Sequence, residues 1–139
     1  MEKIHNNLNI ENLIKTEWFN QFSNLQKISI IYGLKDNVDV SIYAKKEFQF
    51  HQMEEIREGL KNKIDVSVYA KSDFDEEQMN QIRIGLENKL DISWYVKPDF
   101  DWMQMNAIRE DLNVSEYADP TIHRFKMHFI KERLRRENE

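Results

Sequence analysis

Apolar residues in the middle of the chain recur with the spacing of an amphipathic helix, and the whole pattern returns 26 residues later. Apolar positions three and four residues apart form one face of a helix, and such a face predicts packing against a core. The first face comprises Met53, Ile56, Leu60 and Ile64, and the second comprises Met79, Ile82, Leu86 and Leu90. The pattern therefore predicts two long helices in equivalent positions.

These helices belong to a repeated unit of 26 residues. When residues 53–78 are aligned with residues 79–104, 15 of the 26 positions are identical. Residues 27–52 fit the same frame, and a further copy starts at Met105 but is four residues shorter before Tyr117. A glycine inside a helix costs about 1 kcal/mol relative to alanine, so a recurring glycine predicts close approach of another helix. All three glycines of the chain share one slot: Gly33, Gly59 and Gly85.

Each long helix is preceded by a helix-start signal. Asp75 and Gln78 have the spacing of a capping box, in which an N-cap side chain and a glutamine three residues later satisfy each other's backbone N–H groups. The same spacing separates Asp101 from Gln104 and Ser23 from Gln26. We therefore expect the long helices to begin immediately after these N-cap residues.

A shorter element follows the long helix in each unit. Residues 66–70 alternate like a strand and contain β-branched residues, which favours a strand. Asp65 precedes them as an N-cap would, however, and Asp91 does so in the next copy. Pro98 then follows at the distance expected beyond a helix end. We favour a short helix, with the strand as the alternative.

A single unit of this kind cannot bury its own apolar face, so successive copies are expected to stack. The predicted fold class is all-α, a helical tandem repeat of alternating long and short helices. We expect one domain over residues 1–139, with an N-terminal cap in 1–22, repeats in 23–120 and a closing helix in 121–139. Residues 10–22 are expected to form one amphipathic capping helix.

The consensus QMxxIRxGLxxxLDVSxYAxPxFD, as it stands in residues 52–74 and 78–100, resembles tandem repeats in proteins of mobile genetic elements in low-GC Gram-positive bacteria. The resemblance covers roughly residues 22–120. It implies an accessory or interaction factor and brings no catalytic motif with it. Small proteins of such elements often antagonise host defence, so the resemblance implies an inhibitor of the anti-CRISPR or anti-restriction type.

The sequence contains no constellation for catalysis, cofactor binding or metal binding. It has no cysteine, its four histidines lack metal-ligand spacing, and its three glycines lie 26 residues apart rather than in a phosphate-binding loop. Clustered carboxylates such as Asp73 and Asp75 are explained by helix caps and helix dipoles. We therefore predict a protein that is not an enzyme and uses no cofactor.

In a repeat array, constant positions build the scaffold and variable positions remain for recognition. Arg57, Arg83 and Arg109 are constant, and we expect them to pair with acids of adjacent copies rather than to form a basic ligand row. Trp94 and Trp102 are variable, because their slots also accept glutamate at Glu116 and Glu76. A tryptophan in such a slot is a candidate binding anchor. The alternative is that both tryptophans simply cover the shortened last copy.

Charge is distributed unevenly along the chain. The net charge is −5, and residues 121–139 carry six Lys/Arg and three Glu, so the remainder carries −8. The acidic part would suit a basic groove of a partner protein. Its candidate binding residues, beside the two tryptophans, are Asp73, Asp75, Glu76, Glu77, Asp99 and Asp101. The candidate nucleic-acid contacts are Arg124, Lys126, Lys131, Arg133, Arg135 and Arg136.

The expected function is a protein-binding module that acts by surface occlusion, with a nucleic-acid-processing defence complex as the expected partner. One alternative is a nucleic-acid-binding regulator that uses the basic C-terminal helix, and another is a structural or self-assembling repeat protein. The oligomeric state stays open. The chain has no apolar run of 18 residues and no signal-peptide pattern at its start, so we expect a cytoplasmic protein without membrane contact.

Overall fold

The computed structural model describes residues 7–115, and every regular element in this range is a helix. The predicted all-α class is therefore confirmed. The chain divides into two compact units, residues 1–72 and 73–139. Among the described residues, no helix has the length and apolar character needed to cross a membrane.

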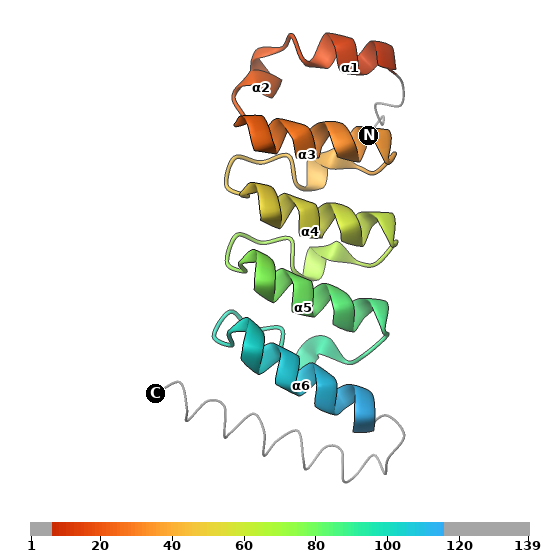
Figure 1. The fold of residues 1–139 in the computed structure, drawn as a ribbon, viewed down its shortest axis with the longest axis vertical. Coiled ribbons are helices and arrows are strands. Elements are labelled where there is room, and N and C mark those ends of the chain that lie inside the picture. Colours follow the sequence, from red (N-terminus) through yellow and green to blue (C-terminus); the bar gives the residue numbers. More distant parts are fainter. Residues whose placement is uncertain (1–6, 116–139) are drawn as a thin grey trace. The chain divides into compact units, whose positions relative to one another are not determined.

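The first unit begins with two short helices and continues with two long ones. The short helices are α1 (Asn7–Leu13) and α2 (Glu17–Asn20). The long helices, α3 (Asn24–Lys35) and α4 (Phe50–Lys61), have twelve residues each and lie side by side (Figure 1). A 3-10 helix of three residues follows each of them, η1 (Val40–Ile42) after α3 and η2 (Val66–Val68) after α4.

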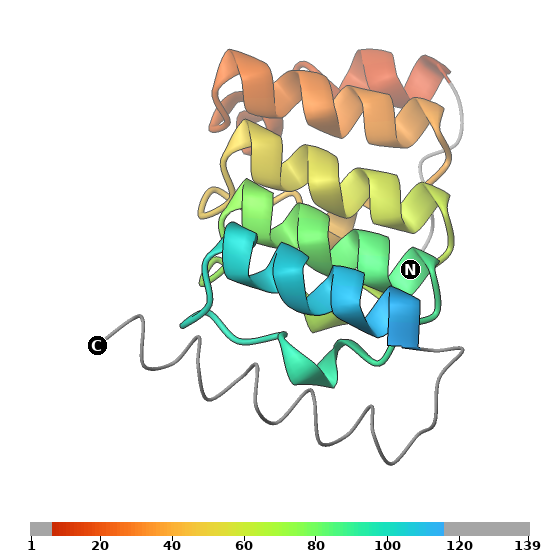
Figure 2. The ribbon, with the colours of Figure 1, turned by 60° about the horizontal axis from the view of Figure 1, so that its bottom comes forward.

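The second unit contains the same kinds of element within its described residues. Helix α5 (Glu76–Glu87) is followed by the 3-10 helix η3 (Ile92–Trp94) and then by α6 (Trp102–Ser115). Helices α5 and α6 are neighbours, and η3 lies in the connection between them, as Figure 2 shows in green and blue. The predicted closing helix over residues 121–139 lies outside the described range.

The prediction of one continuous helix over residues 10–22 is wrong. Helix α1 ends at Leu13, and Thr16 separates it from α2. The Thr16 hydroxyl donates to the carbonyl oxygen of Leu13 at 2.7 Å and accepts from the backbone N–H of Phe19 at 3.1 Å. A threonine that bonds to the backbone on both sides competes with the ladder of a continuous helix. The apolar spacing therefore belongs to two helices.

Helices α3, α5 and α6 start where the sequence predicted. The backbone N–H of Gln78 donates to Asp75 Oδ1 at 2.8 Å, and the backbone N–H of Asp75 donates to Gln78 Oε1 at 2.9 Å. Reciprocal pairs of this kind also join Ser23 with Gln26 and Asp101 with Gln104. Each capping box satisfies N–H groups that the first turn of a helix leaves unpaired.

Three of the long helices also end in the same way. After α4, Lys63 has a left-handed backbone with φ of 61°, and the next N–H, that of Ile64, donates to the carbonyl of Gly59 at 3.2 Å. The equivalent residues after α3 and α5 are Asn37 and Lys89, with φ of 62° and 60°. This hydrogen-bond pattern closes the last turn and directs the chain toward the following 3-10 helix.

The short element is a 3-10 helix in each described copy, so the short-helix prediction is confirmed and the strand alternative is wrong. Before η2, Asp65 Oδ1 accepts from the backbone N–H of Ser67 at 3.1 Å and from its hydroxyl at 2.6 Å. The Asp39–Ser41 and Asp91–Ser93 pairs repeat these bonds. The local hydrogen bonds of the aspartate thus outweigh the strand preference of β-branched residues such as Val66. In the 3-10 helix, Val66 is buried in the core.

The glycine slot is explained by a tyrosine rather than by a second long helix. The Tyr69 hydroxyl is buried and donates to the carbonyl of Glu55 in α4 at 2.7 Å. A Cβ atom added to Gly59 would lie 2.1 Å from that hydroxyl oxygen. Tyr43 and Tyr95 make the equivalent bonds to Ser29 and Gln81, over Gly33 and Gly85. Glycine is therefore required where the tyrosine reaches the helix backbone.

A glutamine fixes the connection in front of the next helix. Beyond its capping bonds, Gln78 donates from Nε2 to the carbonyls of Pro98 at 3.1 Å and Phe100 at 2.6 Å. Gln26 makes the same pair of bonds to Lys46 and Phe48 in the first unit. Because Phe100 precedes the N-cap of α6, Gln78 positions the start of that helix. The start of α6 carries one of the two candidate tryptophans.

Candidate protein-interaction surface

All eight predicted partner-binding residues lie in the second unit, around its connections and helix starts. Asp73, Asp75 and Glu77 are exposed at the start of α5, and Glu76 beside them is half-buried. Asp99 and Asp101 are exposed in front of α6. Trp102 is the first residue of α6, as predicted, and Trp94 is the last residue of η3.

Among the described residues of the second unit, the exposed large apolar side chains are Trp102 and Met103, which we call the tryptophan patch. Trp102 is 39% exposed and Met103 is 59% exposed. Gln104 and Met105, the next two residues, are buried. Successive residues turn by about 100° around a helix, so the first two side chains point away from the core that the next two face. The N-cap position of Asp101 therefore places Trp102 and Met103 on the exposed side of the first turn of α6.

Met103 was missed as a candidate in the sequence. Its slot holds Leu25, His51 and Glu77 in the other copies, so the variability that singled out Trp102 applies to it equally. Trp94, by contrast, is half-buried in the second unit. An anchor must be accessible before binding, so Trp102 and Met103 fit that role better than Trp94.

The second unit has a strongly acidic composition. Its described residues, 73–115, include ten Asp/Glu and four Lys/Arg, a net charge of −6. Two of the four cations are engaged inside the unit: Arg83 pairs with Glu87 at 2.8 Å, and Arg109 donates to the amides of Gln81 and Asn106 at 3.0 and 2.7 Å. The tryptophan patch therefore lies on a unit with excess negative charge.

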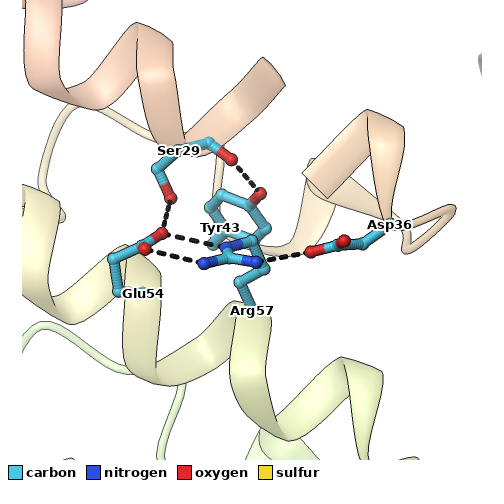
Figure 3. Close-up of polar contacts among 5 residues, drawn as sticks. All are labelled: Ser29, Asp36, Tyr43, Glu54 and Arg57. Carbon is cyan, nitrogen blue, oxygen red and sulfur yellow. Dashed lines mark hydrogen bonds and ion pairs between the residues drawn. The ribbon is translucent and has the colours of Figure 1, made fainter. Parts of the chain in front are cut away.

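The arginine slot is structural in the first unit. Arg57 donates to both oxygens of Glu54, at 2.9 and 2.7 Å, and also pairs with Asp36 at the end of α3. Ser29 donates its hydroxyl to Glu54 at 2.7 Å, so the network joins α3 to α4 beside Tyr43 (Figure 3). The predicted pairing with an acid of an adjacent copy is confirmed for Arg57. Arg109 pairs with neutral amides instead.

The protonation of this network follows from its hydrogen bonds. Burial alone would raise the pKa of Glu54, but the hydrogen bonds from Arg57 and Ser29 and the charge of Arg57 together hold that pKa below its usual value. The hydrogen bond with Glu54 likewise raises the pKa of Arg57 despite its burial. Both groups are therefore charged at neutral pH and act as a fixed ion pair. The arginine is not available as a basic ligand site.

The candidate nucleic-acid contacts, Arg124, Lys126, Lys131, Arg133, Arg135 and Arg136, lie outside the described residues. Within residues 7–115, no group of three or more His, Cys, Asp or Glu side chains could hold a metal ion. The tryptophan patch and the acidic residues around it form the candidate functional site of the described residues.

The chain matches no protein-family model, no curated protein and no solved structure.

Proposed function

We propose that this chain is a non-enzymatic protein-binding module that acts by covering a surface of its partner. The observation that carries the proposal is the tryptophan patch. Trp102 and Met103 are exposed on an acidic unit, in slots that α5 fills with glutamates. Exposed large apolar side chains surrounded by polar residues are typical of protein-binding surfaces.

The scaffold of this module is a helical tandem repeat. In support, α3, α4 and α5 share their length, their left-handed exit and the following 3-10 helix, at intervals of 26 residues. We propose one domain over residues 1–139, with repeats in 23–120 between an N-terminal cap in 1–22 and a closing helix in 121–139. Rigid elements of this kind hold surface side chains in defined positions, which favours binding.

The proposed partner is a protein with a basic surface. A net charge of −6 on the described part of the second unit would attract a basic groove of the kind that binds nucleic-acid phosphates. Together with the mobile-element resemblance, this supports a cytoplasmic nucleic-acid-processing defence complex as the target. The module would inhibit it by occupying the groove.

A comparison of two baits tests the proposal. The patch variant, Trp102→Glu with Met103→Glu, carries the residues that α5 has in the same slots, so the fold tolerates them and the negative charge increases. Wild-type bait should retain a basic protein from a bacterial lysate. The affinity of the patch variant for that protein, once purified, should be at least about tenfold lower, which is the loss expected for an anchor side chain. Equal binding by both baits would overturn the proposal.

Salt dependence supplies a second readout. The association rate should fall steeply as salt rises, because the attraction between an acidic unit and a basic partner is screened. The patch variant should keep this salt dependence while its complex dissociates faster, since the variant removes apolar contacts and retains the charge.

A further inference from the structure

Helix α3 carries a row of exposed apolar residues that we call the apolar stripe. Leu25, Ile28 and Tyr32 are 54%, 38% and 47% exposed. Their spacing of three and four residues places them along one face of the helix, and Lys35 extends that face by one turn. The same slots hold His51, Glu54 and Glu58 in α4, and Glu77, Asn80 and Ile84 in α5.

Leu25 and Ile28 take no part in the core of the first unit, whereas the Tyr32 ring lies under the Arg57 guanidinium, 5.4 Å from ring centroid to Cζ. The residues that α3 buries are Ser29, Ile30, Gly33 and Leu34, which lie on other faces of the helix. Helix α4 has the same length and is followed by the same kind of 3-10 helix with polar residues in all three stripe slots, and α5 does so with polar residues in two of them. Exposed apolar side chains that packing does not require mark an interaction surface.

The charged residues on and beside α3 indicate what kind of surface could bind the apolar stripe. Helix α3 contains two lysines and no acidic residue. Glu54, which accepts a hydrogen bond from Ser29, and Asp36, the C-cap residue of α3, are both ion-paired with Arg57. Lys35 and Asp36 are both exposed at the end of the stripe, and of the two only Lys35 has no ion pair among the described residues. A complementary surface must therefore combine apolar side chains with carboxylates.

The tryptophan patch of this same protein has that combination, because exposed Asp99 and Asp101 lie next to Trp102 and Met103. We propose that copies of the chain associate heterologously, with the tryptophan patch of one copy docked on the apolar stripe of another. Pairing of stripe with stripe would give Lys35 no carboxylate partner, and pairing of patch with patch would bring the carboxylates of Asp99 and Asp101 together. The proposal goes beyond the proposed function, since its partner is a second copy.

The type of contact has consequences for assembly. Because the two surfaces differ, one contact leaves a free stripe on one copy and a free patch on the other, so association continues or closes on itself. Few side chains take part, which places the contact below the roughly 1,200 Å² of a stable complex. The association is therefore weak and concentration-dependent.

Sedimentation equilibrium on the full chain tests the proposal. The stripe variant, Leu25→Glu with Ile28→Asn, carries the residues that α5 has in those slots, and the patch variant is Trp102→Glu with Met103→Glu. Wild-type protein should exceed the monomer mass at concentrations on the order of 100 μM at low salt. Each variant alone should associate at least about tenfold more weakly, with an unchanged helical circular dichroism spectrum.

Mixing the two variants is decisive. The stripe variant keeps its patch and the patch variant keeps its stripe, so an equimolar mixture should form pairs of one copy each and nothing larger. A wild-type protein that stays monomeric, variants that associate like wild type, or a mixture that stays monomeric would overturn the proposal. The stripe variant should still bind the foreign partner in the lysate experiment, so the two proposals fail separately.

Discussion

Single residues in this protein owe their identity to contacts that a helix alone would not demand. Gly59 lies in the interior of α4, where alanine would favour the helix by about 1 kcal/mol. The buried Tyr69 hydroxyl and the Val66 side chain occupy the space that a methyl group would need. The glycine is thus selected by the approach of another element.

Gly59→Ala should therefore destabilise the protein, by about 1–3 kcal/mol, despite its better helix propensity. The added Cβ would lie 2.1 Å from the Tyr69 hydroxyl oxygen and 2.6 Å from Val66 Cγ1, so a buried ring or a β-branched side chain must shift. Urea unfolding followed by circular dichroism measures the change. Lys61→Ala, an exposed site in the same helix, should alter stability by less than about 0.5 kcal/mol. A gain in stability for Gly59→Ala would contradict the clash.

Buried tyrosines also predict the response to alkaline pH. Burial raises the pKa of Tyr43 and Tyr95 well above the ordinary value near 10. The folded state holds these protons more tightly than the unfolded state, so the stability that they contribute is complete below pH 10 and is lost as pH rises beyond it. The free energy of unfolding, measured in urea from about pH 8 to 11, should fall above pH 10.

A matched substitution isolates one tyrosine. Tyr43→Phe should lower the free energy of unfolding at neutral pH by about 1 kcal/mol, because the hydrogen bond to the carbonyl of Ser29 is lost. It should also make the decline above pH 10 shallower, since one ionising group is gone. If the free energy of unfolding of wild type and variant fell in parallel with pH, Tyr43 would have the same pKa in the folded and unfolded states, which would contradict the prediction.

Some side chains form hydrogen bonds both within their own helix and with the connection that leads to the next helix. Gln78 completes the capping box of α5 and also donates to the carbonyls of Pro98 and Phe100 in front of α6. Asp75 takes part in the capping box alone. The two residues therefore allow the helix cap to be separated from the bond to the connection.

Gln78→Ala should cost more stability than Asp75→Ala. Losing an N-cap carboxylate typically costs about 1 kcal/mol. Losing Gln78 also leaves two carbonyls without their amide donor, one of them buried, which adds about 1–3 kcal/mol. Urea unfolding of both variants gives the comparison, with exposed Glu77→Ala as the control in the same turn. The reverse order would show that Gln78 serves only the cap.

For the molecule as a whole, the proposed repeat makes a prediction about chain length. Removing residues 53–78 joins Gln52 to Met79, which restores the sequence Gln-Met found at positions 52–53, 78–79 and 104–105. The remaining capping residues and glycines then keep their spacing of 26 residues. The shortened chain should fold with an unchanged helical circular dichroism signal per residue. Its stability should be somewhat lower, because one 26-residue repeat and the contacts with its neighbours are lost.

Removing only residues 53–65 is the matched control. It deletes half a unit, joins a helix start to a 3-10 segment and places the glycine and tyrosine slots out of register. That chain should lose cooperative urea unfolding. If both deletions unfold the protein equally, the 26-residue frame is not a structural unit and the tandem-repeat proposal fails.

The sequence by itself was sufficient for the local elements. The capping boxes, the aspartate-capped short helices and the all-α class were predicted, because the hydrogen bonds that create them join residues two to four positions apart. Trp102 was placed correctly at the first position of α6 by the same reasoning. The break at Thr16 was missed although its bonds are equally local, because the apolar spacing across it imitates one helix.

Only the tertiary structure decided what the repeated slots are for. The tyrosine that requires each glycine lies 14 residues from the carbonyl it reaches, the Gln78 amide bonds to carbonyls 20 and 22 residues away, and Arg109 reaches Gln81 across 28 residues. Exposure of the tryptophan patch and of the apolar stripe likewise depends on which helix faces are already packed. Repetition in a sequence marks such positions, but their partners are set by how the chain folds back on itself, which local spacing does not encode.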